Sequence, residues 1–138
     1  MQVCAACQFK GAVHGEEGRA AVDDLHAVEA HDVGDRAAAA EVDAAGGTSL
    51  VVPTDITDEA QVNHLVEESL KAFGKVDVLV NNAFRVPSMR PLANTTFEHM
   101  RDAIELTVFG ALRMTQGFTP ALETAKGSVG YSLGVGDS

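Results

Sequence analysis

A buried strand that ends in two asparagines is the feature that most constrains how this chain can fold. The run Val76–Val80 holds four apolar residues and one aspartate, which is typical of a short strand inside a sheet. Asn81, Asn82 and Ala83 follow directly. Open α/β sheets bind ligands outside the carboxyl ends of their strands, so these three residues are candidates for a binding site. Two side-chain amides placed there can hydrogen-bond backbone and sugar groups without adding charge.

A strand and a helix precede this run. The apolar segment 49–52 predicts a strand that Pro53 ends. A helix should follow, with Thr57 as its cap and Gly74 as its stop. Its inward face is predicted from apolar residues at helical spacing, namely Val62, Leu65, Val66, Leu70 and Phe73.

A second, longer helix follows the strand. Thr95 and Glu98 have the spacing of a capping box, and the helix is expected to end before Pro120. Its amphipathic pattern comes from Phe97, Met100, Ile104, Val108, Ala111, Leu112 and Thr115. The segment 126–129 predicts a turn into another strand. Strands and helices that alternate in this way indicate an α/β protein with a parallel sheet and crossover connections.

Length and charge exclude several classes of function. The 138 residues suit one domain with its own core. The net charge of −10 would repel a phosphate backbone, so no nucleic-acid partner is expected. No stretch approaches the roughly 20 apolar residues that span a bilayer. The first residues lack the basic-then-apolar layout of a signal peptide, so the expected location is the cytoplasm.

Cysteine and histidine give no metal-site pattern. Cys4 and Cys7 have a Cys-x-x-Cys spacing, but no second pair follows to complete a zinc site. They are interpreted as small residues of an N-terminal strand or chain end. His64 and His99 are expected on solvent-facing sides of helices. No metal is therefore predicted.

Four segments together resemble the short-chain dehydrogenase/reductase (SDR) family. They are Asp35–Glu41, Thr54–Thr57, Asn81–Ala83 and the long helix from Phe97 to Gln116. Their order and spacing match the family from about residue 35 to 129. The resemblance implies a doubly wound parallel sheet of Rossmann type, incomplete here, with about strands 1–5 of the family's sheet. The whole chain, 1–138, would be one partial NAD(P)-binding domain. In it, residues 1–34 match poorly and 130–138 form a non-matching tail.

The resemblance also implies a nicotinamide cofactor and the residues that would bind it. Asp55 matches the aspartate that contacts the adenine amino group. Asp35 suits the ribose hydroxyl of NAD and Arg36 suits the 2′-phosphate of NADP, so the choice of cofactor stays open. The full set of implied cofactor-binding residues is Asp55, Ile56, Asn81, Asn82, Ala83, Asp35, Arg36, Gly11, Gly15 and Gly18.

The glycine loop departs from the family pattern. Gly11, Gly15 and Gly18 have one residue too many before the last glycine, and Glu16 and Glu17 stand where phosphates should bind. Two carboxylates there would oppose an anion. A polar loop with turn glycines is the alternative.

The catalytic residues of the family are mostly missing from these 138 residues. Thr107 occupies the position of an asparagine that holds a water in the family's proton relay. Tyr131 is the only tyrosine, and four residues later stands Val135 instead of the lysine that lowers a catalytic phenol's pKa. Tyr131 and Ser132 are therefore interpreted as tail residues. These departures suggest a truncated or frame-altered family member.

Two functional classes follow. The first is an NAD(P)-dependent oxidoreductase lineage that acts on small carbonyl or alcohol substrates, with this chain alone expected to be inactive. The second is a non-catalytic Rossmann-like module that binds a ligand or self-associates. Family members often dimerise through the long helix, so a homo-oligomer through residues 96–118 is expected.

Overall fold

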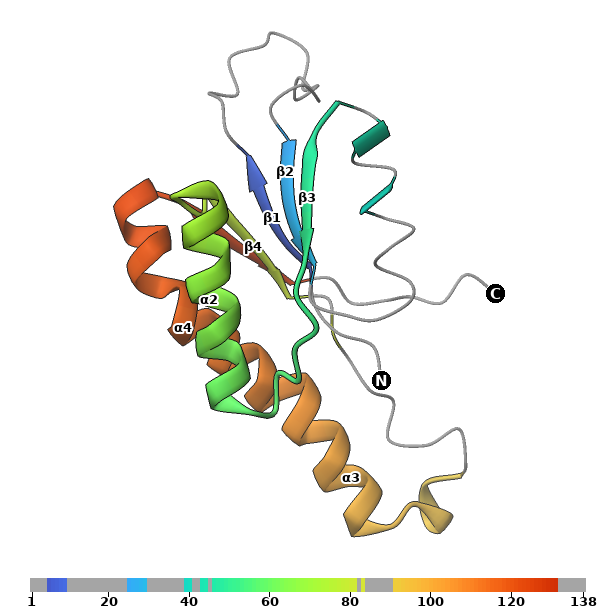
Figure 1. Cartoon of the computed structure of the whole chain (residues 1–138). Coiled ribbons are helices and arrows are strands. Elements are labelled where there is room, and N and C mark those ends of the chain that lie inside the picture. The colour runs from blue at the N-terminus through green and yellow to red at the C-terminus, as the bar shows by residue number, and fades with distance from the viewer. Residues whose placement is uncertain are drawn as a thin grey trace, which may run out of the picture.

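The computed structural model describes residues 5–9, 25–29, 39–40, 43–44, 46–81, 83 and 91–131, with only the strand backbone described in the first two segments. From β3 onward its strands alternate with helices, which confirms the α/β class (Figure 1). Its main elements are β1 (Ala5–Phe9), β2 (Leu25–Glu29), β3 (Thr48–Val51), α2 (Glu59–Phe73), β4 (Val78–Asn81), the 3₁₀ helix η2 (Leu92–Asn94), α3 (Phe97–Ile104), the π-helix η3 (Glu105–Gly110), α4 (Ala111–Ala125) and β5 (Ser128–Tyr131).

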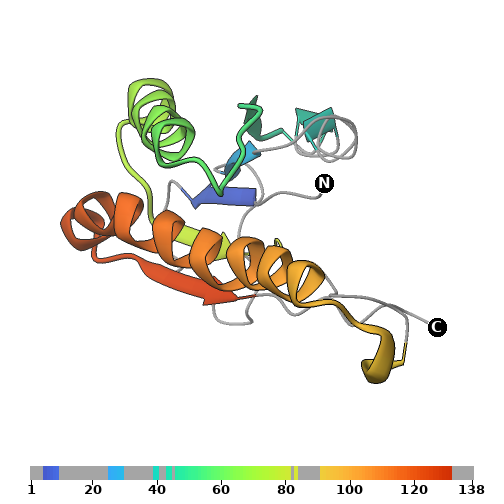
Figure 2. The same cartoon turned by 90° about the horizontal axis from the view of Figure 1, so that it is seen from below.

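The strands form two hydrogen-bonded groups that lie side by side. One has the order β1-β2-β3, the other pairs β4 with β5, and β1 lies beside β4. The β2–β3 and β4–β5 pairs are parallel, as the sequence predicts. Helices α2 and α4 pack against each other, and the helical run α3–α4 crosses β4 and β5 (Figure 2). The arrangement is that of an incomplete Rossmann-like sheet.

The direction of β1 departs from an all-parallel sheet. β1 and β2 are antiparallel, with Ala5 opposite Glu29 and Phe9 opposite Leu25. A parallel pair needs a crossover connection, usually a helix that packs on the sheet. The connecting segment 10–24 has three glycines and only two large apolar residues, both valines. Its sequence therefore carries no apolar face for such a helix.

The N-cap of helix α2 lies one residue later in the chain than the sequence predicts. Asp58, not Thr57, is the N-cap, and its carboxylate accepts hydrogen bonds from the backbone N–H groups of Ala60 and Gln61. A hydrogen bond from the Gln61 side chain, followed by these two backbone bonds, lowers the pKa of Asp58. The predicted stop is confirmed, because Gly74 ends the helix in the left-handed conformation at a φ of 77°.

The long helix, residues 97–125, is continuous but contains a π-helical insert. Thr96, rather than Thr95, caps it by accepting from the His99 N–H at 3.2 Å. The insert η3 separates α3 from α4 at residues 105–110. π-Helical turns hold an extra residue relative to an α-helix and are often found at functional sites. The sequence pattern does not reveal this insert.

The long helix also continues through Pro120, where the sequence predicts its end. Proline lacks the N–H that would bond the carbonyl of Gln116. Gln116 and Pro120 are both exposed, so a water molecule can donate a hydrogen bond to that carbonyl. Phe118 and Leu122, on either side of the proline, are buried in the core. Their burial outweighs the lost hydrogen bond and keeps the last turn helical.

The row of residues that the long helix buries shares only Ala111 with the predicted face. Its buried positions are Ala103, Leu106, Gly110, Ala111, Met114, Phe118 and Leu122. Of the predicted face, Ile104, Val108 and Leu112 are 41%, 54% and 48% exposed, and Phe97 is 85% exposed. Small residues at 103, 110 and 111 let the helix approach its neighbours closely. A Cβ added to Gly110, for example, would lie 2.6 Å from Cδ1 of Ile56.

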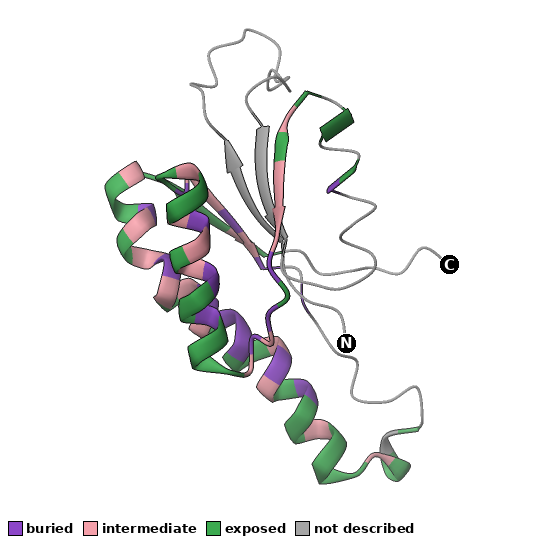
Figure 3. Ribbon diagram, in the orientation of Figure 1, coloured by how far each residue is buried: buried purple, intermediate pink, exposed green. Residues whose placement is uncertain are grey.

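The core lies between β4 and the inner faces of α2 and α4 (Figure 3). Its buried cluster includes Leu65 from α2, Leu79 from β4, and Met114 and Phe118 from α4, each 0% exposed. The same cluster includes Ile56, Ala83 and Leu106. One core therefore joins the loop after β3, the end of β4 and the insert η3.

A tight connection leads from α4 into β5. Lys126 adopts the left-handed conformation at a φ of 53°, and the Gly127 N–H donates to the Leu122 carbonyl at 2.8 Å. The next N–H, of Ser128, donates to the Asp77 carbonyl at 2.9 Å and begins the pairing of β5 with β4. A Cβ at Gly127 would collide with the Asp77 carbonyl oxygen. The turn predicted at 126–129 is thus confirmed, and only glycine fits at its centre.

Candidate functional site

The candidate site lies at the carboxyl ends of β3 and β4, which run in the same direction (Figure 1). The loop after β3 carries Asp55 and Ile56, and β4 ends at Asn81. The shared core beneath them includes Ile56, Ala83 and Leu106. These three residues are next to Asp55, Asn82 and Thr107 in the chain. The structure therefore brings together the segments around these three predicted site residues.

Hydrogen bonds fix the loop that carries Asp55. The Asp55 N–H donates to Oε1 of Gln61 at 2.8 Å, and its Oδ1 accepts from both the N–H and the hydroxyl of Thr57, at 2.9 and 2.7 Å. The hydroxyl of Thr54, which is buried, donates to the Val52 carbonyl at 2.9 Å. A carboxylate has about four lone-pair positions, so Asp55 retains acceptor capacity for a ligand. Ile56 is only 1% exposed and anchors this loop in the core.

The end of β4 is anchored to α4. Asn81 is 6% exposed, and its Nδ2 donates to Oγ1 of Thr115 at 3.2 Å. Ala83 is buried as well, at 8% exposure. The Asn81 side chain thus faces the helix, and Asn81 is the last residue of β4.

Sequence reasoning misses two residues at this edge. It places Thr115 only on a helix face and interprets Tyr131 as a tail residue. In the structure Tyr131 belongs to β5, where it is the parallel partner of Asn81, and its hydroxyl lies 3.3 Å from Oγ1 of Thr115. The apolar strand pattern after Lys126 is the signal that could have found it, because a parallel β5 that extends to residue 131 must end beside β4.

Thr107 lies in the π-helical insert, half-buried, one turn before Gly110. Gly110 packs against the loop after β3, because a Cβ added to it would lie 2.6 Å from Cδ1 of Ile56. The insert therefore places Thr107 on the segment of the long helix that lies against the loop after β3.

The remaining predicted site residues lie outside the part of the chain that the structure describes. They are Asn82, Asp35, Arg36 and the glycines Gly11, Gly15 and Gly18. The strand before Asp35, β2, ends at Glu29. Both His64 and His99 are exposed, as predicted. In the described part of the chain, no cluster of three or more His, Cys, Asp or Glu residues could hold a metal.

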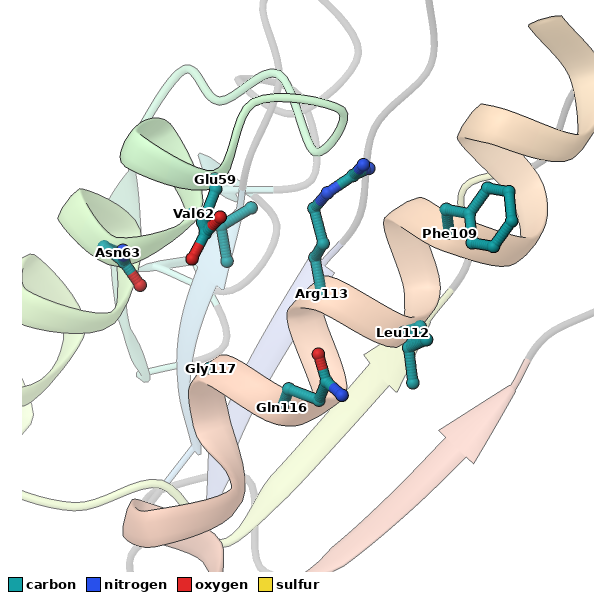
Figure 4. Close-up of a pocket in the computed structure, with 8 residues that line it drawn as sticks. All are labelled: Glu59, Val62, Asn63, Phe109, Leu112, Arg113, Gln116 and Gly117. Atoms are coloured by element: carbon teal, nitrogen blue, oxygen red, sulfur yellow. The ribbon is translucent and has the colours of Figure 1, made fainter.

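A hollow of about 440 Å³ lies between α2 and the long helix, apart from the strand ends (Figure 4). Its polar groups come from Glu59, Asn63, Arg113 and Gln116, and part of its apolar wall from Phe109 and Leu112. Arg113 is also paired with Glu105, Nη2 to Oε1, at 2.6 Å. In the segments that the structure describes, no helix is long and apolar enough to cross a membrane.

Residues 19–132 match the family model described as enoyl-(acyl carrier protein) reductase. Over 96 residues the chain is 34% identical to mouse hydroxysteroid dehydrogenase-like protein 2, which covers 70% of this chain and 19% of the mouse protein. It is 37% identical over 97 residues to 2,5-dichloro-2,5-cyclohexadiene-1,4-diol dehydrogenase of Sphingobium indicum, covering 67% of this chain and 39% of that enzyme.

Solved structures of dehydrogenases also match this chain. A 7α-hydroxysteroid dehydrogenase in complex with NADH and 7-oxo glycochenodeoxycholic acid matches with a TM-score of 0.66 at 28% identity, over 75% of this chain and 41% of that one. An alcohol dehydrogenase from Thermococcus sibiricus, complexed with 5-hydroxy-NADP, matches in fold with a TM-score of 0.67 at 23% identity, over 75% and 45%. The chain thus spans less than half the length of each of these relatives.

Proposed function

The chain belongs to the short-chain dehydrogenase/reductase family, and from this premise we propose that its sheet edge binds the adenosine part of NAD or NADP. The observation that carries the proposal is the shared core of Ile56, Ala83 and Leu106, which holds the loop after β3, the end of β4 and the insert η3 at one edge. Ligands of open α/β sheets bind at such an edge.

The described residues fit this part of the cofactor. The carboxylate of Asp55 is fixed by Thr57 and can still accept a hydrogen bond from the exocyclic amine of adenine. Backbone groups at 81–83, with Asn82, would contact the ribose. We assign Asp35 and Arg36 to the ribose of NAD or NADP, and Gly11, Gly15 and Gly18 to the pyrophosphate.

For the reaction we propose the family's chemistry on a small carbonyl or alcohol substrate. The bound nicotinamide would supply or accept the hydride. Thr107 would hold a water by its hydroxyl, in place of an amide. The printed sequence contains no Tyr-x-x-x-Lys, so a polypeptide of these 138 residues is proposed to bind cofactor without turnover.

Replacing Asp55 with alanine should weaken NADH binding by about tenfold, because a hydrogen bond to a charged acceptor is lost. The chain has no tryptophan, so the emission of NADH itself can report binding without interference from that residue. NADPH titrated in the same way would decide between the cofactors.

Asp102→Ala provides the matched control, since Asp102 is exposed on α3. It should leave the affinity unchanged. Equal NADH affinity of Asp55→Ala and the unsubstituted chain would show that Asp55 does not contact the cofactor. No binding of either nucleotide by the unsubstituted chain would refute the proposed function.

A second candidate function is self-association through residues 96–118. Ile104, Val108 and Leu112 follow one another at four-residue spacing and are exposed, and Phe109 beside them is 46% exposed. Exposed apolar side chains grouped in this way are typical of protein interfaces. We propose a homo-oligomer that buries this surface.

The double change Val108→Ser and Leu112→Ser should shift the chain toward monomer, because it removes apolar area from the proposed interface. Sedimentation velocity over a range of concentrations measures the shift. Val129→Ser is the control, because Val129 is 37% exposed but lies outside residues 96–118. A monomeric unsubstituted chain at every concentration would exclude the interface.

A further inference from the structure

The hydroxyl of Thr115 joins three elements beneath the candidate site. Its Oγ1 lies 3.2 Å from Nδ2 of Asn81 in β4, 2.8 Å from the carbonyl oxygen of Ala111 in its own helix, and 3.3 Å from the hydroxyl of Tyr131 in β5. Asn81 and Tyr131 are also direct partners in the β4–β5 register. The side chain of Thr115 therefore connects the last residues of both strands to α4.

The number of protons and lone pairs on the Thr115 hydroxyl determines which group donates in each hydrogen bond. A threonine hydroxyl has one proton to donate and two lone pairs to accept with. The Ala111 carbonyl can only accept, so the Thr115 proton is directed to it. The groups that remain must then donate to Thr115. Asn81 accordingly presents its N–H to Thr115, and Tyr131 donates its phenolic proton.

Two consequences follow at the site. The amide of Asn81 has a single orientation, which holds the strand end that leads into Asn82 and Ala83. The phenolic oxygen of Tyr131, whose residue is 63% exposed, keeps its lone pairs for another partner. Because its proton is donated to Thr115, this oxygen can only accept a further hydrogen bond. A hydroxyl or an amide N–H of a ligand could donate that bond.

We propose that Thr115 is a positioning residue of the dinucleotide site, which orients Asn81 and holds the Tyr131 hydroxyl as an acceptor toward the bound ligand. This role rests on the proposed function. It uses no residue of the family pattern other than Asn81, and it gives Tyr131 a binding role that does not require the missing lysine.

Thr115→Val tests the role, because valine keeps the branched shape and removes the hydroxyl. In the free protein, hydrogen exchange of the Asn81 side-chain amide, followed by NMR, should accelerate about tenfold. NADH affinity should fall about five- to tenfold, as expected when the hydrogen bonds of the Thr115 hydroxyl with Asn81 and Tyr131 are lost. Thr115→Ser should retain both properties, and Tyr131→Phe should weaken NADH binding while leaving the Asn81 amide protected.

Thr124→Val is the matched control, since Thr124 makes the same type of bond to the carbonyl four residues earlier, at 2.9 Å, but at an exposed position. It should leave both readings unchanged. Unchanged exchange of the Asn81 amide in Thr115→Val would overturn the hydrogen-bond assignment. Unchanged NADH affinity, in a chain that binds NADH before substitution, would overturn the positioning role alone. If the unsubstituted chain binds no NADH, the positioning role fails together with the proposed function.

Discussion

Replacing Phe118 with alanine is expected to lower the free energy of unfolding by about 4 kcal/mol, the largest effect of any single change considered. The Phe118 side chain is 0% exposed in the core between α4, α2 and β4. Its removal loses the transfer energy of the ring and leaves a cavity that the surrounding side chains fill only in part. Urea unfolding followed by far-UV circular dichroism measures the change.

The same substitution at Phe97 is the control. Phe97 is 85% exposed at the start of α3, so Phe97→Ala should change the free energy of unfolding by less than about 0.5 kcal/mol. Similar effects of the two substitutions would contradict the packing of α4 described above. Loss of all cooperative unfolding in Phe118→Ala would agree with it, because about 4 kcal/mol is a large part of the stability of a small domain.

Replacing Gly127 with alanine is expected to lower the free energy of unfolding by about 3 kcal/mol. The new Cβ would collide with the backbone carbonyl of Asp77, which cannot move away as the end of a side chain can. That carbonyl also accepts the first hydrogen bond from β5, through the Ser128 N–H at 2.9 Å. Relief of the collision therefore separates the first residues of the two strands.

Gly130→Ala, within β5, is the corresponding change at a position with space available. Its Cβ would meet only the Leu79 carbonyl oxygen, at 4.0 Å. We expect a small effect on urea unfolding there, and amide hydrogen exchange in β4 and β5 should accelerate in Gly127→Ala only. Equal stability of the two variants would show that residue 127 lies farther from Asp77 than in the structure.

The sequence is sufficient to predict the elements whose signals are local. Helix α2 has an apolar face, acidic residues at its start and Gly74 at its end, and each acts within a few residues of the chain. Strand β4 is evident from its apolar run, and the turn before β5 from Lys126 and Gly127. The candidate edge at Asp55 and Asn81 follows from the sequence for the same reason, since Asn81 stands directly after one predicted strand and Asp55 three residues after another.

The features that the sequence does not predict depend on contacts between distant segments. The helix continues past Pro120 because Phe118 and Leu122 are buried, which local propensity does not include. The buried row of the long helix combines small residues that permit close approach with large apolar ones, and which row is buried depends on the segments packed against the helix. The bonds of Thr115 to Asn81 and Tyr131 span 34 and 16 positions of the chain, so no periodicity could indicate them.

The π-helical insert also determines how this family member can tolerate length changes. Each residue of an α-helix turns the following residues by about 100°. A one-residue deletion within 105–110 would leave α3 and α4 helical but would rotate one about its axis relative to the other. Ala103 or Met114 would then leave the core, although composition would hardly change. In an alignment of relatives, gaps should therefore avoid this segment for a packing reason, in addition to the proposed role of Thr107.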